Sequence, residues 1–461
     1  MGRKRQNNQD QLALWEEGKG EAPTSTHQGT EMPAAERETE SPAETEFLME
    51  VVVERENLDR ALKRVRKNRG SPGIDGITVK ELPGYLKENW PRIREQLLSG
   101  TYEPKPVKRV QIPKPNGGVR NLGIPTVLDR FIQQAILQVL TPTWDPTFSE
   151  SSYGFRPGRS AHQAVAQAQT YIAEGHNWVV DLDLDKFFDR VNHDMLMGRI
   201  AKRVEDKRML KIIRAFLNSG VMEGGLVSPT VEGTPQGGPL SPLLSNIMLD
   251  DLDRELERRG HKFVRYADDI VIYVRSERAG RRVMESITRF ITRKLKLKVN
   301  SEKSVVDRPR KRSYLAFSFT GGENPRRRIA PKAIARFKKR IRELTRRTRG
   351  ISIEQMIADL RRYLLGWRAY FGFCQTPSVL RELDSWIRRR LRSVIWKQWI
   401  RGRTRYAELR SRDIGRELAA KTAGSPHGPW RISRSPALNY AFPNAHFHAL
   451  GLPTLEHGLI A

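Results

Sequence analysis

The sequence lacks cysteine pairs, long apolar runs and enough acidic residues to balance its basic ones. Cys374 is the only cysteine in 461 residues, which excludes an internal disulfide framework and any zinc module built from several cysteines. No apolar stretch approaches the roughly 20 residues that cross a bilayer, and the opening M-G-R-K-R-Q-N-N lacks the apolar segment of a secretory signal. We therefore expect a soluble, cytoplasmic protein.

The shortage of acidic residues leaves a formal charge of +29. Such an excess repels itself unless a polyanion neutralises it, so nucleic acid is the leading partner and an anionic membrane surface is the alternative. The first 50 residues run against this trend, with five basic and eleven acidic side chains. They are also poor in apolar residues, so we expect residues 1–49 to be a disordered acidic leader and the polyanion-binding surface to lie downstream.

Two adjacent aspartates interrupt the apolar segment F-V-R-Y-A-D-D-I-V-I-Y-V, which begins at Phe263. Apolar residues run up to Asp268 and Asp269 and resume at once, which predicts two strands joined at the aspartates. Neighbouring carboxylates repel each other, so they favour solvent or a bound divalent cation over dry burial. A solvated turn is the alternative, because Asp is common in turns.

A second set of carboxylates lies in W-V-V-D-L-D-L-D-K-F-F-D, which begins at Trp178. Strand alternation places the apolar residues on one face and Asp181, Asp183 and Asp185 on the other. Such a row can be a solubility device on an edge strand. Alternatively, Asp183 together with the later aspartate pair can hold two Mg²⁺ ions about 4 Å apart, as phosphoryl transfer requires.

Three loops offer groups that suit nucleotide or RNA binding. A predicted hairpin over residues 107–125 turns at N-G-G, and Lys114 and Arg120 flank its tip, where they either clamp a triphosphate or are simply solvated. The loop Y-G-F-R-P-G-R-S contains Arg156 and Arg159 beside aromatic residues, which is typical of RNA contacts and equally of packing. In G-T-P-Q-G-G-P-L-S-P, glycines let backbone approach a planar ligand, and Gln236 offers donors and acceptors.

A basic helical region follows from about residue 325. Residues 361–410 contain thirteen Lys or Arg and three Asp or Glu. Cations on a helix are usually just solvated, but this excess costs energy unless phosphates neutralise it, which predicts an RNA-binding surface. The helix predicted from Leu380 to Trp399 has a buried apolar stripe, and its cations are expected to face outward or flank that stripe: Arg388, Arg389, Arg390, Arg392 and Lys397. Residues 411–461 show no clear period.

Taken in order, these motifs resemble a reverse transcriptase of the group II intron type with its maturase domain. The resemblance covers residues 55–410. The matching segments are G-S-P-G-I-D-G from Gly70, R-N-L-G-I-P-T-V-L-D-R from Arg120, Y-G-F-R-P-G-R-S from Tyr153, D-L-D-K-F-F-D from Asp183, G-T-P-Q-G-G-P-L-S-P from Gly233, Y-A-D-D from Tyr266, N-S-E-K from Asn300, Y-L-A-F-S-F from Tyr314, L-L-G-W-R-A-Y-F-G from Leu364 and L-D-S-W-I-R-R-R-L-R from Leu383.

The resemblance implies a role for each matched residue. It implies metal ligation by Asp183 and Asp268, with Asp269 supporting, and Mg²⁺ as a cofactor of two ions. Phe188 matches the aromatic that excludes a ribose 2′-hydroxyl, and Lys303 matches the lysine that protonates departing pyrophosphate. The nucleotide contacts are matched by Lys114, Arg120 and Gln236. One departure is Ala316, where the family commonly has glycine in the primer-grip strand.

The resulting expectation is an α+β right-hand polymerase followed by an all-helical domain. We expect fingers over residues 50–175, a ferredoxin-like palm over 176–320, thumb or maturase helices over 321–410 and a tail over 411–461 that is a candidate DNA-binding segment. We expect no zinc-dependent H-N-H endonuclease domain. The resemblance implies intron RNA, a DNA target or primer and deoxynucleoside triphosphates as partners, with no membrane; the sequence does not settle whether the chain is a dimer.

Two alternatives to this function remain at the level of the sequence. A splicing cofactor without polymerase activity would keep the basic helices, but the intact Asp183, Asp268 and Asp269 argue against it. A reverse transcriptase of another retroelement or of a defence system would keep the aspartates, but would not need the maturase helices.

Overall fold

The computed structural model describes residues 46–113, 119–223, 226–228, 232–234 and 237–456. The chain divides into two compact units, which we describe separately. The first unit contains the chain up to Ser160, Val180–Ile272 and Arg278–Val306, and the second contains Ala161–Val179, Tyr273–Glu277 and the chain from Asp307 onward. No helix in the described part of the chain is long and apolar enough to cross a membrane.

The first unit begins with helices that pack around α4 (Val127–Trp144). The Thr126 hydroxyl accepts a hydrogen bond from the Asp129 N–H and so caps α4, as the spacing of these two residues predicts. The apolar stripe of α4 is buried, including Phe131, Ile132 and Ile136. The other helices of this group are α1 (Leu48–Val52), α2 (Arg55–Asn68) and α3 (Leu82–Leu98).

A four-stranded sheet with the order β2-β1-β4-β5 belongs to the same unit. Strands β1 (Val107–Pro113) and β2 (Val119–Ile124) pair antiparallel, which confirms the predicted hairpin, although its N-G-G turn lies outside the described residues. The parallel partner of β1 is β4 (Val221–Glu223), which pairs in turn with β5 (Leu226–Ser228).

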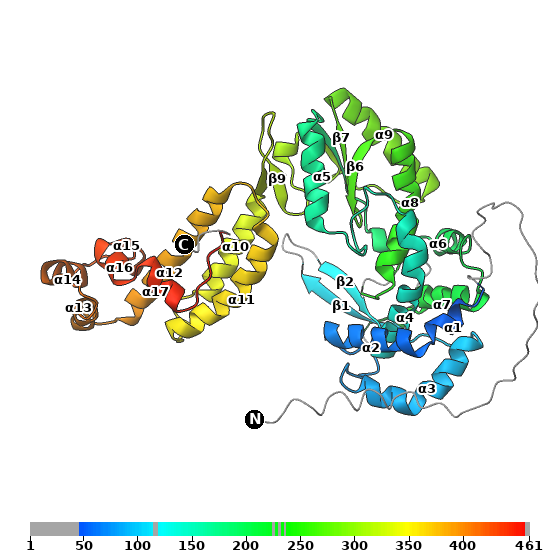
Figure 1. The fold of residues 1–461 in the computed structure, drawn as a ribbon, viewed down its shortest axis with the longest axis horizontal. Helices are drawn as coiled ribbons and strands as arrows, with labels where there is room; N and C mark the ends of the chain where they lie inside the picture. The colour runs from blue at the N-terminus through cyan, green and yellow to red at the C-terminus, as the bar shows by residue number, and fades with distance from the viewer. Residues whose placement is uncertain (1–45, 114–118, 224–225, 229–231, 235–236, 457–461) are drawn as a thin grey trace, which may run out of the picture. The chain divides into compact units, whose positions relative to one another are not determined.

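A second four-stranded sheet has the order β6-β7-β3-β8. Figure 1 labels two of its strands, β6 and β7. Its first strand along the chain, β3 (Trp178–Leu182), and its third, β7 (Asp269–Val274), are the two central strands. The outer strands are β6 (Lys262–Tyr266) and β8 (Val305–Asp307). Helical connections lead from β3 to β6 and from β7 to β8, so this is the split βαβ arrangement predicted for the palm. The connecting helices are α6 (His193–Ile200), α7 (Lys207–Asn218), α8 (Ser241–Arg258) and α9 (Glu277–Lys294).

The second unit is mainly helical. Its hydrophobic core runs through α10 (Pro331–Leu344), α11 (Ile353–Phe371) and α12 (Pro377–Gln398), with Phe337, Leu360 and Leu391 fully buried. A two-stranded ribbon and one more helix also belong to this unit: β9 (Phe317–Phe319), β10 (Arg327–Ile329) and α5 (Ala161–Ala173).

The C-terminal region is helical rather than unpatterned. Five short helices follow α12, and apolar residues of this region such as Leu438, Phe447 and Leu455 join the same core as α10–α12. Each helix is too short to show a clear period in the sequence, because each offers the core only one or two turns. They are α13 (Gly402–Arg410), α14 (Arg416–Ala423), α15 (Pro429–Ile432), α16 (Pro436–Ala441) and α17 (Asn444–Ala449).

Candidate active site and nucleic-acid interface

A two-residue turn, Ala267–Asp268, joins β6 to β7, and we call it the aspartate turn. The prediction of two strands meeting at the aspartates is confirmed, with one refinement: Asp269 is the first residue of β7 rather than part of the turn. Ala267 adopts a left-handed conformation with φ of 58°, which is uncommon for a residue with a Cβ. Neighbouring structure must therefore hold this turn in place.

Asp183 directly follows β3, the strand that neighbours β7 in the sheet. Leu182 and Leu184 are buried and the aspartates between and beside them are partly exposed, so the predicted alternation is confirmed. The N-S-E-K-S segment holds Asp183 through its main chain: the Asn300 N–H donates to the Asp183 carbonyl over 2.8 Å, and the Asp183 N–H donates to Ser304 Oγ over 3.0 Å.

The structure brings Lys303 beside Asp183. The Lys303 Nζ lies 3.3 Å from Asp183 Oδ2, and about two thirds of the lysine side chain is exposed. An exposed ammonium group beside the Asp183 carboxylate is compatible with the general-acid role that the resemblance implies for Lys303.

A pocket of about 570 Å³ combines several of the predicted motifs. Asp268 and Phe188, the latter in a 3₁₀ turn over Phe187–Asp189, both line it. Phe155 of the Y-G-F-R loop and the two glycines that follow Gln236 also line it. The pocket is therefore bordered by a carboxylate that the resemblance assigns to metal binding and by the aromatic residue that it places under the incoming sugar.

Phe188 also lines a second pocket of about 480 Å³. That pocket faces β1 and β4 and carries the cations Arg109, Lys186 and Arg190. Asn121 lines it as well. Phe188 thus borders two cavities of the first unit.

Arg130 lines the larger pocket and was not among the predicted site residues. Its Nη2 donates to the Ser71 carbonyl over 2.6 Å, whereas its Nε is buried without a hydrogen-bond partner in the described part of the chain. Burial lowers the pKa of this guanidinium below its usual value. Arg130 is the last residue of the matching segment R-N-L-G-I-P-T-V-L-D-R, and this position could have indicated a functional role. It was missed because a polar residue in a predicted helix is usually solvent-exposed.

Three predicted nucleotide contacts cannot be placed. Lys114 and Gln236 lie outside the described residues. Arg120 pairs through its backbone with Ile112 in the β1–β2 ladder, and the position of its side chain is not described.

The carboxylates fit magnesium better than a metal that needs a protein cage. Among the described residues, no group of three or more His, Cys, Asp or Glu side chains is arranged to hold a metal ion. Mg²⁺ is commonly bound by only one or two carboxylates together with substrate phosphates and water. Asp183, about one third exposed, and Asp268 on a pocket wall are donors of that kind.

The expectation that Arg156 faces RNA is wrong. Arg156 is 8% exposed, and its Nε lies 2.8 Å from Asp145 Oδ1. Its Nη1 donates to the Ser149 and Ser152 carbonyls over 2.6 and 2.9 Å. These contacts fold the loop from within. Arg159 is partly exposed and forms an ion pair with Glu150, so its predicted RNA contact stays a prediction.

The cations of α12 are mostly engaged inside the second unit. Arg392 is buried and donates twice to the Phe442 carbonyl, so it does not face outward as expected. Arg390 donates to Thr345, and Arg389 stacks on Trp430 at 3.8 Å. The C-terminal helices, which the sequence pattern did not reveal, cover this face of α12. Arg388 is half-buried, and Lys397 is exposed.

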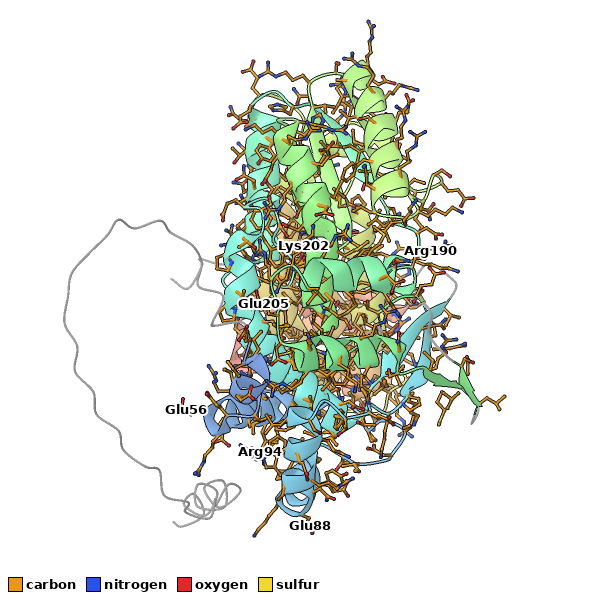
Figure 2. All side chains as sticks on the ribbon, turned by 90° about the vertical axis from the view of Figure 1, so that its right-hand side faces the viewer. Glu56, Glu88, Arg94, Arg190, Lys202 and Glu205 are labelled. Carbon is orange, nitrogen blue, oxygen red and sulfur yellow. The ribbon has the colours of Figure 1, made fainter. Side chains whose placement is uncertain are left out.

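An exposed cationic face lies on α10 instead. Lys332, Arg336 and Lys339 recur at i, i+4 and i+7, opposite the buried Phe337 and Ile341. All three side chains are exposed. By contrast, the surface in Figure 2 mixes both signs of charge around Glu56, Glu88, Arg94, Lys202 and Glu205. We call the three cations the α10 basic face.

Two family models match the chain. Residues 112–319 match the reverse transcriptase (RNA-dependent DNA polymerase) family, and residues 334–412 match the group II intron maturase-specific domain. The first match contains Asp183, Asp268 and the pocket's Phe188, and the second contains most of α10 and all of α11 and α12.

Similar proteins include YkfC of Escherichia coli, 33% identical over 299 residues, which are 56% of this chain and 78% of YkfC. The group II intron-encoded protein LtrA of Lactococcus lactis is 30% identical over 311 residues, 53% of this chain and 52% of LtrA, so the chain spans about half the length of that relative. A solved partial Cas6-RT-Cas1–Cas2 complex is 27% identical with a TM-score of 0.35, covering 53% of this chain and 42% of that one. The chain belongs to the reverse transcriptases of the group II intron type, which join an RNA-directed DNA polymerase to a maturase-specific domain.

Proposed function

We propose that this reverse transcriptase polymerises deoxynucleotides in the 570 Å³ pocket, with Asp183 and Asp268 holding two Mg²⁺ ions and Asp269 supporting them. One observation supports the proposal most. Asp183 directly follows β3 and Asp268 directly precedes β7, the neighbouring strand of the palm sheet, and Asp268 borders the pocket that Phe188 lines. Bound there, Mg²⁺ lowers the pKa of a primer 3′-hydroxyl and neutralises the developing pyrophosphate charge.

The surrounding residues supply the remaining functions. Phe188 occupies the space beside the sugar and excludes a 2′-hydroxyl. Lys303, beside Asp183, donates a proton to the departing pyrophosphate. Arg130 also lines this pocket, where its charged guanidinium group favours the triphosphate or the template phosphates. Lys114, Arg120 and Gln236 complete the proposed nucleotide contacts.

The second unit binds the intron RNA in this proposal and so assists splicing and intron mobility. The α10 basic face supports it, since three exposed cations lie along one face of the helix; the acid nearest to them along this face, Glu343, pairs with Arg340. Arg159 and Lys397 remain candidate phosphate contacts, while buried Arg156 and Arg392 do not.

Primer extension with purified protein tests the polymerase function. An RNA template, a DNA primer, Mg²⁺ and deoxynucleotides should give full-length DNA, and chelation of Mg²⁺ should abolish the product. An Asp268→Asn variant should give no product while binding intron RNA as wild type does. A wild-type protein that binds intron RNA and supports splicing but never extends the primer would favour a splicing cofactor without polymerase activity.

A further inference from the structure

A buried ion pair lies directly behind the aspartate turn. Arg265 of β6 and Asp253 of α8 are both fully buried. The Arg265 Nε donates to the two Asp253 oxygens over 2.8 and 3.0 Å, and Nη2 donates over 2.5 Å. Removing both charges from water costs about as much as their attraction returns, so a buried pair is weak evidence for a stabilising role. The position of the Arg265–Asp253 pair behind the aspartate turn indicates a different role.

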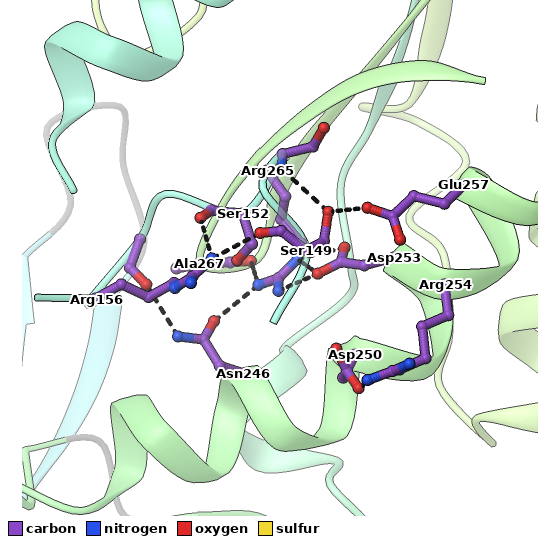
Figure 3. A network of polar contacts seen from close by, with 12 residues as sticks. Ser149, Ser152, Arg156, Asn246, Asp250, Asp253, Arg254, Glu257, Arg265 and Ala267 are labelled. Atoms are coloured by element: carbon purple, nitrogen blue, oxygen red, sulfur yellow. Dashed lines mark hydrogen bonds and ion pairs between the residues drawn. The ribbon is translucent and has the colours of Figure 1, made fainter. Parts of the chain in front are cut away.

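The third nitrogen of Arg265 reaches the aspartate turn itself. Its Nη1 donates to the Ala267 carbonyl over 3.0 Å and to Asn246 Oδ1 over 2.9 Å (Figure 3). The Asn246 Nδ2 donates in turn to the Gly154 carbonyl over 2.9 Å. One guanidinium, oriented by Asp253, therefore connects α8, the aspartate turn and the Y-G-F-R loop.

The Y-G-F-R loop presses against the same turn. The Arg265 N–H donates to the Ser151 carbonyl, and the Tyr153 N–H donates to the Arg265 carbonyl, each over 2.9 Å. A Cβ on Gly154 would lie 2.2 Å from the Ala267 nitrogen, so only glycine fits there. The left-handed Ala267 is thus held on one side by the loop and on the other by Arg265.

We propose that Arg265, Asp253 and Asn246 are positioning residues that fix the Ala267 carbonyl and thereby the direction of the Asp268 carboxylate. The proposal rests on the proposed function, in which Asp268 binds Mg²⁺. Arg265 touches no reacting group and acts only through the turn. The Y-G-F-R loop then supports the proposed metal-binding carboxylate of Asp268. Arg156 contributes to this support indirectly, because its hydrogen bonds to the Ser149 and Ser152 carbonyls stabilise the loop.

The first test is amide hydrogen exchange of residues 266–270 without metal, in wild type, Asn246→Ala and Arg265→Lys. Lysine keeps the charge beside Asp253 but lacks the forked second contact. Both variants should raise exchange at the turn by about tenfold or more, because its supporting hydrogen bonds are lost. Asn57→Ala is the matched control: Asn57 is equally buried and donates to the Val52 and Ala135 carbonyls, away from the turn.

The second readout is the Mg²⁺ concentration that gives half-maximal primer extension. Loss of a group that orients a metal ligand typically costs about 10- to 100-fold in metal affinity or activity. We expect that shift in Asn246→Ala and Arg265→Lys, with the KM for deoxynucleotides within about twofold of wild type because neither side chain lines the pocket. Asn57→Ala should match wild type.

Two results would overturn the proposal. The first is a rate of amide exchange at residues 266–270 that equals the wild-type rate in both Asn246→Ala and Arg265→Lys. The second is an increase of this rate in Asn57→Ala that is as large as the increase in those two variants. The exchange measurement needs no catalysis, so an inactive wild-type protein would refute the proposed function while leaving this support of the turn testable.

Discussion

At the scale of single residues, Phe188 is the side chain whose role is easiest to isolate. It borders the pockets of about 480 and 570 Å³, and of these two Phe155 borders only the larger one. Phe188→Ala should lower the preference for deoxynucleotides over ribonucleotides by about tenfold or more, because the ring that excludes the 2′-hydroxyl is gone. Competition between dCTP and CTP in primer extension measures this, with Phe155→Ala as the control. If Phe188→Ala and Phe155→Ala lost the preference for deoxynucleotides equally, Phe188 would not be the residue that excludes the 2′-hydroxyl.

Ala316 has a strained backbone conformation, at a position that the family resemblance had already identified as unusual. It stands where the family commonly has glycine, and its φ is 66°, a conformation that costs a residue with a Cβ about 1–2 kcal/mol. Ala316→Gly removes that cost but adds about 0.4–1 kcal/mol of unfolded-state entropy, so the variant should be up to about 1.6 kcal/mol more stable. Chemical unfolding of the two proteins measures the difference. Destabilisation by more than about 1 kcal/mol would show that the methyl group is needed.

The residues predicted from sequence separate into two kinds. Asp183 and Asp268 lie where local patterns placed them, because alternation in a strand and a two-residue break between strands are set by neighbours in the chain. Phe188 was singled out by the family resemblance and not by a local pattern. Arg156, Arg265 and Arg392 could not be placed this way. They are buried against a carbonyl 7 residues away, a carboxylate 12 residues away and a carbonyl 50 residues away, respectively, and only the folded loop or the packing of two elements brings these partners together.

At the scale of elements, the start of α4 contains a buried acid. Asp129 is 1% exposed and accepts hydrogen bonds from the Tyr102 and Thr126 hydroxyls, over 2.9 and 2.6 Å. Burial dominates these contacts and raises the pKa of the Asp129 carboxyl from 3.8 to about 6. The folded protein therefore holds this proton more tightly than the unfolded chain does.

The raised pKa predicts a pH dependence of stability. The contribution of Asp129 is fully present below about pH 4 and is lost as pH rises through about 6, by at most about 3 kcal/mol. Asp129→Asn cannot titrate, so the free energy of unfolding of wild type relative to this variant should fall between pH 4 and pH 6. Denaturant unfolding at several pH values measures this. A constant difference between the two proteins would mean that the carboxyl titrates normally.

Elements with a clear apolar period were predictable, and the short C-terminal helices were not. The β1–β2 hairpin and the central strands of the palm follow from apolar periodicity. The helices α14 to α17 are four to eight residues long, and their burial depends on the core they share with α12. Residues of this C-terminal region also engage Arg389 and Arg392, which periodicity along α12 alone places facing outward or beside the buried stripe.

At the scale of the whole molecule, the charge of +29 predicts RNA binding that depends steeply on salt. The α10 basic face should contribute: replacing Lys332, Arg336 and Lys339 with Gln should weaken intron RNA binding and reduce the slope of log K against log salt by about 2. Filter binding across a range of salt concentrations measures this slope. The control replaces Arg94 and Lys202, exposed on the mixed-charge surface of Figure 2, and should leave the slope unchanged. Equal slopes for wild type and the α10 variant would place the RNA elsewhere.

The account depends most on Asp183 and Asp268 acting as one site, and a double-mutant cycle of primer extension on an RNA template tests this directly. Asp183→Asn and Asp268→Asn should each slow incorporation by about a thousandfold or more, and the double variant should be no slower, because groups that act as a unit are not additive. Asp185→Asn, two residues away and paired with Arg190, should stay within about threefold of wild type. Independent, multiplying losses from Asp183 and Asp268, or an active Asp268→Asn enzyme, would contradict a shared metal site.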